Sequence, residues 1–213
     1  MRTVKAVAVL AFAFVLMGSA SLAQERDAWT EVQPGVHQIE EGSKTLTLAD
    51  GAQALPWIRA HFESRVTELT ARYLENPSNE LWQAITLGVA KARQAAELEK
   101  TGGPVSTHAP FTRSTEFVFA YAFRARSLLS AYAIADYENP SVSADIYTEA
   151  FSDPSNSGGF TSCSDSGLDV ECNSSSAGFS PFGAPCEADA YAEIWIPSTS
   201  TLISISDSAT DCN

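Results

Sequence analysis

The sequence predicts an α+β protein, with an N-terminal β-hairpin and a helical hairpin followed by a disulfide-bearing antiparallel β-sheet or small sandwich. Three observations lead to this fold class. Apolar residues recur at helical spacing between residues 57 and 100, they alternate with period two over much of residues 117–207, and all four cysteines follow residue 162. Because helices repeat every 3.6 residues and strands every two, the change of period marks a change of structure.

The first 23 residues are predicted to be a signal peptide. Arg2 and Lys5 form a basic start, residues 6–17 are apolar, and Ser21-Leu22-Ala23 offers the small residues that a signal peptidase needs. The apolar run is short for a transmembrane helix. We therefore expect cleavage near Ala23 and a mature chain that is secreted or periplasmic and has no transmembrane segment.

Residues 24–103 are expected to hold the hairpin and the helical pair. Val36 to Glu40 and Lys44 to Leu48 flank Glu41-Gly42-Ser43, a pattern that predicts two strands joined by a tight turn.

Two helices are predicted next, over residues 57–75 and 79–100. Asn76-Pro77-Ser78 separates them, and Thr101-Gly102-Gly103-Pro104 ends the second. Each predicted helix carries one stripe of apolar residues, and the two stripes are expected to meet each other or to cover a sheet. They consist of Ile58, Phe62, Val66, Leu69 and Tyr73 in the first helix, and of Trp82, Ile85, Val89, Ala92 and Ala96 in the second.

Residues 104–213 are expected to form an acidic antiparallel β domain with two disulfides. Aromatic and small residues alternate over residues 117–123 and 131–135, as in amphipathic strands. Further strands are predicted from Glu187 onward and over residues 201–207.

Between these strands, residues 153–185 are rich in Ser, Gly, Asn and Pro and are expected to form an irregular loop pinned by disulfides. In an exported chain, an even number of cysteines predicts disulfides, and four cysteines leave three connectivities open. Zinc binding is the alternative, although the chain contains no C-x-x-C pair. The four cysteines are Cys163, Cys172, Cys186 and Cys212.

Charge is unevenly distributed along the chain. The formal net charge is −13, all 13 Lys and Arg lie at or before Arg126, and residues 127–213 carry 13 Asp and Glu without a basic residue. Such a surface repels nucleic acid and anionic lipid and attracts cations, so we expect no nucleic-acid partner. General solubility is the alternative interpretation of this charge.

Two segments share one pattern. Residues 144–151 read ADIYTEAF and residues 188–195 read ADAYAEIW, 44 residues apart. Because alternate residues share a face of a strand, the Ala and Ile residues should pack while the acids and rings meet water. The candidate ligand-binding residues on this second face are Asp145, Tyr147, Glu149, Asp189, Tyr191, Glu193 and Trp195.

An exposed aromatic and acidic face would suit a sugar or a cation. Aromatic rings stack on sugars, carboxylates accept hydrogen bonds from hydroxyls, and carboxylate oxygens also hold Ca²⁺. A purely structural role is the alternative, since amphipathic strands routinely carry Tyr and acids toward solvent. We expect a non-enzymatic, exported binding or interaction protein, with a glycan or another envelope protein as its partner.

A polysaccharide-acting hydrolase with strand-borne carboxylates is the second interpretation. Glu187, Asp189 and Glu193 resemble the acid clusters of jelly-roll glycoside hydrolases, although their spacing differs by one residue. Carboxylates four residues apart on a strand stand roughly 13 Å apart, farther than the roughly 5 Å of a retaining pair. The chain has no G-x-S-x-G elbow, and we assign no catalytic residue and no metal ligand.

The W-x-x-V-x-P-G-V segment of residues 29–36, the helical pair with its Asn-Pro-Ser break and the Cys-bearing β segment resemble uncharacterised bacterial secreted proteins. The resemblance implies an exported chain with this order of parts, and it implies no activity.

Overall fold

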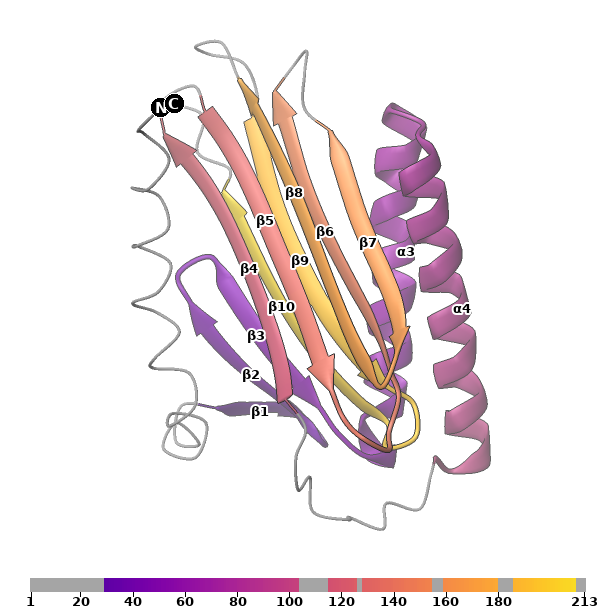
Figure 1. The fold of residues 1–213 in the computed structure, drawn as a ribbon. Coiled ribbons are helices and arrows are strands. Elements are labelled where there is room, and N and C mark those ends of the chain that lie inside the picture. The colour runs from indigo at the N-terminus through magenta and orange to yellow at the C-terminus, as the bar shows by residue number, and fades with distance from the viewer. Residues whose placement is uncertain (1–28, 104–114, 126–127, 155–158, 180–185, 210–213) are drawn as a thin grey trace. The chain divides into compact units, whose positions relative to one another are not determined.

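The computed structural model describes most of the chain after residue 28 (Figure 1). Residues 31–213 form one compact unit, and the predicted signal peptide lies outside the described residues. Neither helix in the described part of the chain combines the length and apolarity that crossing a bilayer would take. The described ranges are 29–103, 115–125, 128–154, 159–179 and 186–209.

The predicted N-terminal hairpin is confirmed. It consists of β2 (Val36–Glu41) and β3 (Lys44–Ala49), and Gly42 at their turn has a φ of 64°. An additional strand, β1 (Thr30–Gln33), precedes it. The β1–β2 turn requires Gly35, because its φ is 73° and an added Cβ would lie 2.6 Å from the Asp50 carbonyl oxygen.

The predicted helical hairpin is also confirmed, as α3 (Leu55–Glu75) and α4 (Asn79–Thr101), after a short 3₁₀ helix, η2 (Ala52–Ala54). The Ser78 hydroxyl caps α4 by accepting a hydrogen bond from the amide of Leu81, 3.1 Å away. Gly102 then ends α4 in the left-handed conformation.

The buried face of α4 differs from the predicted stripe. Trp82, the first residue of that stripe, is 58% exposed, whereas Leu81 and Ala84 are buried. The buried face also contains Lys91, which a purely apolar pattern cannot include. The helix is therefore turned by about one residue from the predicted orientation, and its sheet-facing side is partly polar.

Ten strands form two sheets in the described part of the chain. Sheet A has the order β1-β2-β3-β10-β9-β6-β7, and sheet B has the order β4-β5-β8 (Figure 1). The remaining strands are β4 (Thr115–Ala125), β5 (Leu128–Glu138), β6 (Ala144–Pro154), β7 (Phe160–Gly167), β8 (Asp169–Phe179), β9 (Cys186–Ile196) and β10 (Thr201–Ala209).

Strand pairing joins the N-terminal hairpin to the C-terminal strands. β3 pairs antiparallel with β10, with Leu46 opposite Ile205 and Ala49 opposite Leu202. The boundary expected between residues 103 and 104 is thus crossed by a β-ladder, and both sides of it belong to the compact unit of residues 31–213.

Sheets A and B pack face to face around a core that is unusually rich in alanine. Small side chains let two sheets approach closely, and the larger apolar residues fill the remaining space. The sequence prediction that the Ala and Ile face of the repeated strands packs is confirmed. The buried core comprises Ala120, Leu129, Ala131, Ala133, Ala135, Tyr137, Ala144, Ile146, Ala150, Val170, Cys172, Ala188, Ala190, Ala192, Ile194 and Ile196.

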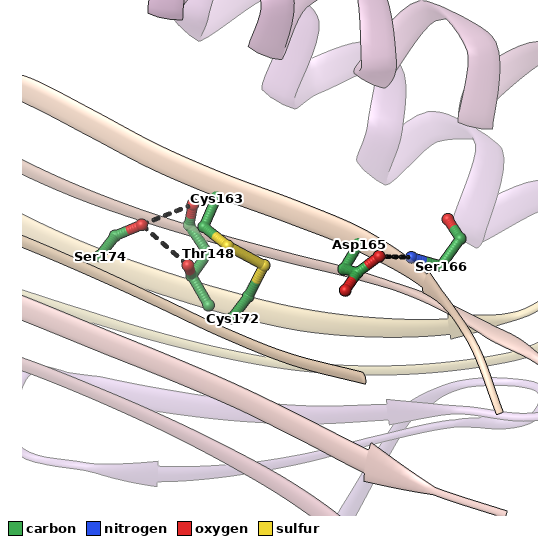
Figure 2. Close-up of a disulfide and its surroundings, with 6 residues drawn as sticks. All are labelled: Thr148, Cys163, Asp165, Ser166, Cys172 and Ser174. Atoms are coloured by element: carbon green, nitrogen blue, oxygen red, sulfur yellow. Dashed lines mark hydrogen bonds between the residues drawn. A yellow bond between two sulfur atoms is a disulfide. The ribbon is translucent and has the colours of Figure 1, made fainter. Parts of the chain in front are cut away.

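The predicted irregular loop over residues 153–185 is wrong where the structure describes it, because β7 and β8 occupy most of that segment. The polar residues of β8 that face the other sheet bond to its polar residues. The Ser174 hydroxyl lies 2.8 Å from that of Thr148 (Figure 2). The Ser176 hydroxyl lies 2.6 Å from that of Ser152. A serine-rich composition therefore reflects paired hydroxyls inside the sandwich.

One of the two predicted disulfides is confirmed. Cys163 of β7 and Cys172 of β8 are bonded, with their Cα atoms 5.5 Å apart, so the bridge joins sheet A to sheet B (Figure 2). The side chains of the other two cysteines, Cys186 and Cys212, lie outside the described residues.

Candidate functional site

The predicted binding face of the repeated strands is covered by the helical hairpin, so its predicted exposure is wrong. Tyr147 and Glu149 of β6 are 5% and 2% exposed, and Tyr191, Glu193 and Trp195 of β9 are 5%, 4% and 0% exposed. Asp145, Asp189 and Phe151, toward the ends of the same faces, are partly buried. These residues form a polar layer between sheet A and the helices.

The two repeats pair with each other in this layer. β6 and β9 are antiparallel, and Tyr147 lies opposite Glu193 while Glu149 lies opposite Tyr191. Each tyrosine hydroxyl donates to the glutamate two residues further along its own strand, at 2.7 Å in β6 and 2.5 Å in β9. The repeat in the sequence thus becomes an approximate two-fold arrangement of Tyr–Glu pairs.

The helices neutralise the acids of the layer. The guanidinium of Arg65 pairs with Glu149, and the guanidinium of Arg72 lies 2.5 Å from Asp189. Lys91 Nζ lies 2.6 Å from Glu193 Oε1, and both side chains are almost fully buried.

These contacts join residues 84, 117 and 102 positions apart, respectively. The basic first half of the chain therefore balances acids of the second half only in the folded state.

Hydrogen bonds extend from the Lys91–Glu193 pair to His61 on α3. The hydroxyl of Tyr191 donates its only hydrogen to Glu193, so its oxygen accepts from Nε2 of His61, 2.7 Å away. This assigns the proton of the neutral imidazole to Nε2. Tyr191 also lies beneath the guanidinium of Arg65, whose carbon is 4.3 Å from the ring centroid.

The pKa values of the layer follow from burial and pairing. Burial, reinforced by Glu193, raises the pKa of Tyr191 well above its ordinary value, so the hydroxyl remains protonated. Burial also opposes ionisation of Glu193, but the charge of Lys91 and the hydrogen bonds from Lys91 and Tyr191 more than offset it and hold the pKa of that carboxyl below its ordinary value. At the open end of β9, burial and a hydrogen bond with Asp189 raise the pKa of Glu187 to about 7.

A recess of about 250 Å³ opens beside the layer. Its wall includes His61, Arg65, Asp189, Ser206 and Ser208. Of the acids that line it, Glu149 and Asp189 pair with arginines of α3, and Asp207 accepts hydrogen bonds from the Ser43 hydroxyl and the Ala122 amide. Within the described residues, no group of three or more His, Cys, Asp or Glu could hold a metal ion. The arrangement therefore fastens the helices to the sheet.

Acid should destabilise the fold through His61. Burial lowers the pKa of His61 from 6.5 to about 4, although Glu193 and Glu68 oppose this effect and Arg65 and Lys91 add to it. Between these two pH values the unfolded chain binds a proton that the folded chain does not, so the free energy of unfolding decreases as the pH falls. The loss amounts to roughly 2–3 kcal/mol.

We expect the variant His61→Gln, whose amide can still donate to Tyr191, to lack this loss. Urea denaturation at a series of pH values measures the unfolding free energy of both proteins, and groups common to both, including Glu187, cancel in the difference. The advantage of the wild type over the variant should shrink by roughly 2–3 kcal/mol between about pH 7 and pH 4. A difference that is independent of pH would contradict the prediction.

The second notable surface is the outer face of sheet B, which we define as the outward-pointing residues of β4, β5 and β8. Side chains alternate cleanly along β5, where Leu129, Ala131 and Ala133 are buried and their neighbours point outward. The large exposed residues of the outer face are Phe117 (44%), Tyr121 (42%), Phe123 (38%), Leu128 (40%) and Tyr132 (37%).

Four aromatic rings form a column along β4. Phe117, Phe119, Tyr121 and Phe123 have centroids 6.5, 6.5 and 6.0 Å apart in sequence order, and successive ring planes differ by 4°, 24° and 14°. Tyr132 of β5 meets Phe119 edge to face at 6.3 Å. We call these four residues of β4 the aromatic column.

Four carboxylates lie at one end of the outer face. Asp136 stands opposite Glu171, and Glu138 stands opposite Asp169, all on the outward side of β5 and β8. Asp136 is also opposite Phe117, so the acids adjoin the first ring of the aromatic column.

The alternation over residues 117–123 predicts a strand, but an exposed aromatic surface was not predicted there. The signal was present, since four aromatic residues at alternate positions are more than a half-buried strand requires. The sequence does not show which side of sheet B packs against sheet A, and that packing decides whether the rings or the alanines between them face the core.

No protein-family model matches this chain, and no curated protein matches it either.

Proposed function

We propose that this protein is an exported, non-enzymatic binding module that recognises an extended polypeptide segment of a partner through the outer face of sheet B. The aromatic column carries the proposal. Exposed apolar surface on a folded domain marks interaction sites, and aromatic residues dominate the energetics of protein interfaces. The Cys163–Cys172 disulfide fits an oxidising compartment outside the cytosol.

The spacing of the rings favours a polypeptide as the occupant. Neighbouring centroids are 6.0–6.5 Å apart, and alternate side chains of any extended chain repeat at about 6.6 Å. An extended segment lying along β4 would therefore place every second side chain at an equivalent position on the aromatic column. The acidic and aromatic face of β6 and β9 offers no such access, because the helices cover it.

Selection from a displayed library of random peptides tests this proposal. The variant Phe117→Thr/Tyr121→Thr/Phe123→Thr removes three rings while keeping β-branched residues that suit a strand. Peptides enriched on the wild-type protein should bind this variant at least about tenfold more weakly, since buried aromatic contacts each contribute 1 kcal/mol or more at interfaces.

The matched control removes exposed apolar residues elsewhere. Val32, Leu74 and Trp82 are 44%, 76% and 58% exposed and lie on β1, α3 and α4. The variant Val32→Thr/Leu74→Gln/Trp82→Gln should retain wild-type affinity for the enriched peptides. Equal binding to the wild type and to the aromatic-column variant, or the absence of any enrichment, would refute the proposed function.

A further inference from the structure

The four carboxylates beside the aromatic column have no ion-pair partner among the described residues. Each ion pair of the described chain involves other acids, located on the helices or in the polar layer. The shortage is built into the sequence, because residues 127–213 contain no Lys or Arg. Neither β5 nor β8 can therefore supply a counter-charge.

The placement of these acids is unfavourable for the isolated protein. Like charges at directly opposite positions of an antiparallel pair destabilise it, and Asp136–Glu171 and Glu138–Asp169 are two such pairs in succession. In the polar layer, by contrast, Arg65, Arg72 and Lys91 each form an ion pair with an acid of sheet A. The acids of the outer face thus form two adjacent like-charged pairs for which the described residues supply no cation.

We infer that the partner segment bound by the outer face is basic, with alternate apolar side chains on the aromatic column and Lys or Arg side chains against Asp136, Glu138, Asp169 and Glu171. The inference rests on the proposed function and specifies the chemistry of its partner. Opposite charges across an interface steer encounter and select partners, while the buried rings supply most of the affinity.

Charge distinguishes this occupant from a second copy of the chain. Two copies would each bring a net charge of −13, and the outer face of the second copy would carry the same four acids. Among the described side chains, the basic group next to the aromatic column is that of Lys44, whose Nζ lies 5.9 and 5.4 Å from the ring centroids of Phe119 and Tyr121. A single lysine on each copy does not balance four carboxylates.

Binding of three synthetic nine-residue peptides, measured by fluorescence anisotropy, tests the inference. The first carries three lysines at one end, followed by leucine and serine in alternation, so that its leucines share one side of an extended chain and its lysines reach the acidic end of the outer face. The second replaces its lysines by glutamate, and the third replaces its leucines by serine. The lysine–leucine peptide should bind at least about tenfold more tightly than either of the others. Only this peptide offers both apolar side chains to the aromatic column and positive charges to the carboxylates.

Two protein variants separate local from general attraction. Glu138→Gln/Asp169→Asn/Glu171→Gln removes three exposed acids of the outer face, and Glu75→Gln/Glu80→Gln/Glu97→Gln removes three exposed acids of the helices. Both lose the same charge. The first should weaken binding of the lysine–leucine peptide roughly tenfold, as loss of several ion pairs predicts, whereas the second should leave it within about twofold.

The outcomes distinguish failure of the inference from failure of the proposed function. Equal losses in the two acid variants, tight binding of the glutamate–leucine peptide, or no measurable binding of the lysine–leucine peptide would overturn the basic partner. If the glutamate–leucine peptide binds and requires the aromatic column, the proposed function still stands. If the peptides bind equally well after Phe117→Thr/Tyr121→Thr/Phe123→Thr, the proposed function itself fails.

Discussion

Replacing Lys91 by methionine is expected to lower the free energy of unfolding by about 3–5 kcal/mol. The Lys91 and Glu193 side chains are only 3% and 5% exposed, and their charged atoms lie 2.6 Å apart. Methionine fills similar space but leaves the Glu193 carboxylate in the polar layer without its cation. Denaturation in urea or guanidinium chloride measures the free energy of unfolding. Its dependence on denaturant concentration should stay unchanged if the variant alters stability alone.

A double variant serves as the control. In Lys91→Met/Glu193→Leu both charges are gone, and the Tyr191 hydroxyl can still bond to His61. Most of the lost stability should return, because replacing a whole buried pair by apolar residues is often neutral. The exposed pair of Lys100 and Glu97 gives the comparison at the surface, where Lys100→Met should cost less than about 1 kcal/mol. If Lys91→Met lowered the free energy of unfolding by as little as Lys100→Met, Lys91 and Glu193 would not form a buried ion pair.

Trp195→Ala should lower the free energy of unfolding by about 3–5 kcal/mol, as truncation of a buried aromatic does. Trp195 is 0% exposed, its ring meets that of Phe62 of α3 edge to face at 5.8 Å, and its Nε1 donates to Gln94 of α4 at 2.8 Å. The substitution would remove contacts with both helices at once. From the sequence alone, this residue belongs to a solvent-facing set, for which roughly 1 kcal/mol or less is expected.

Two neighbours calibrate the measurement. Ile194, on the opposite face of β9, is also 0% exposed, so Ile194→Ala should cost about 2–5 kcal/mol. Trp82→Ala removes the same type of side chain from an exposed position and should cost less than about 1 kcal/mol. If Trp195→Ala behaved like Trp82→Ala, the helices would not cover sheet A as described.

The strands and helices were predictable because their patterns are local. The hairpin of β2 and β3, the helices α3 and α4 and the amphipathic strands β4, β5 and β9 all follow from periods of two or 3.6 residues and from turn residues. β8 was not predicted because three of its four buried positions are Cys172, Ser174 and Ser176, which do not form an apolar alternation. Such residues are satisfied only by partners on another sheet, as Ser174 is by Thr148.

The candidate site was harder to predict because exposure is not a local property. The alternation in β6 and β9 shows that two chemically different faces exist, and the alternation in β4 shows the same, but neither pattern states what lies against each face. The helices pack against the acidic and aromatic face of sheet A. In the described part of the chain, no layer covers the aromatic face of sheet B.

By itself, the sequence determined the fold class, the periods of its helices and strands, and the separation of positive from negative charge along the chain. Only the tertiary structure decided which amphipathic face was buried. The physical reason is electrostatic. The acids of β6 and β9 can be buried because Arg65, Arg72 and Lys91, all from the helical hairpin, reach them across about a hundred residues of chain. Among the described side chains, no such cation pairs with the acids of β5 and β8, which lie on the outward side beside the aromatic column.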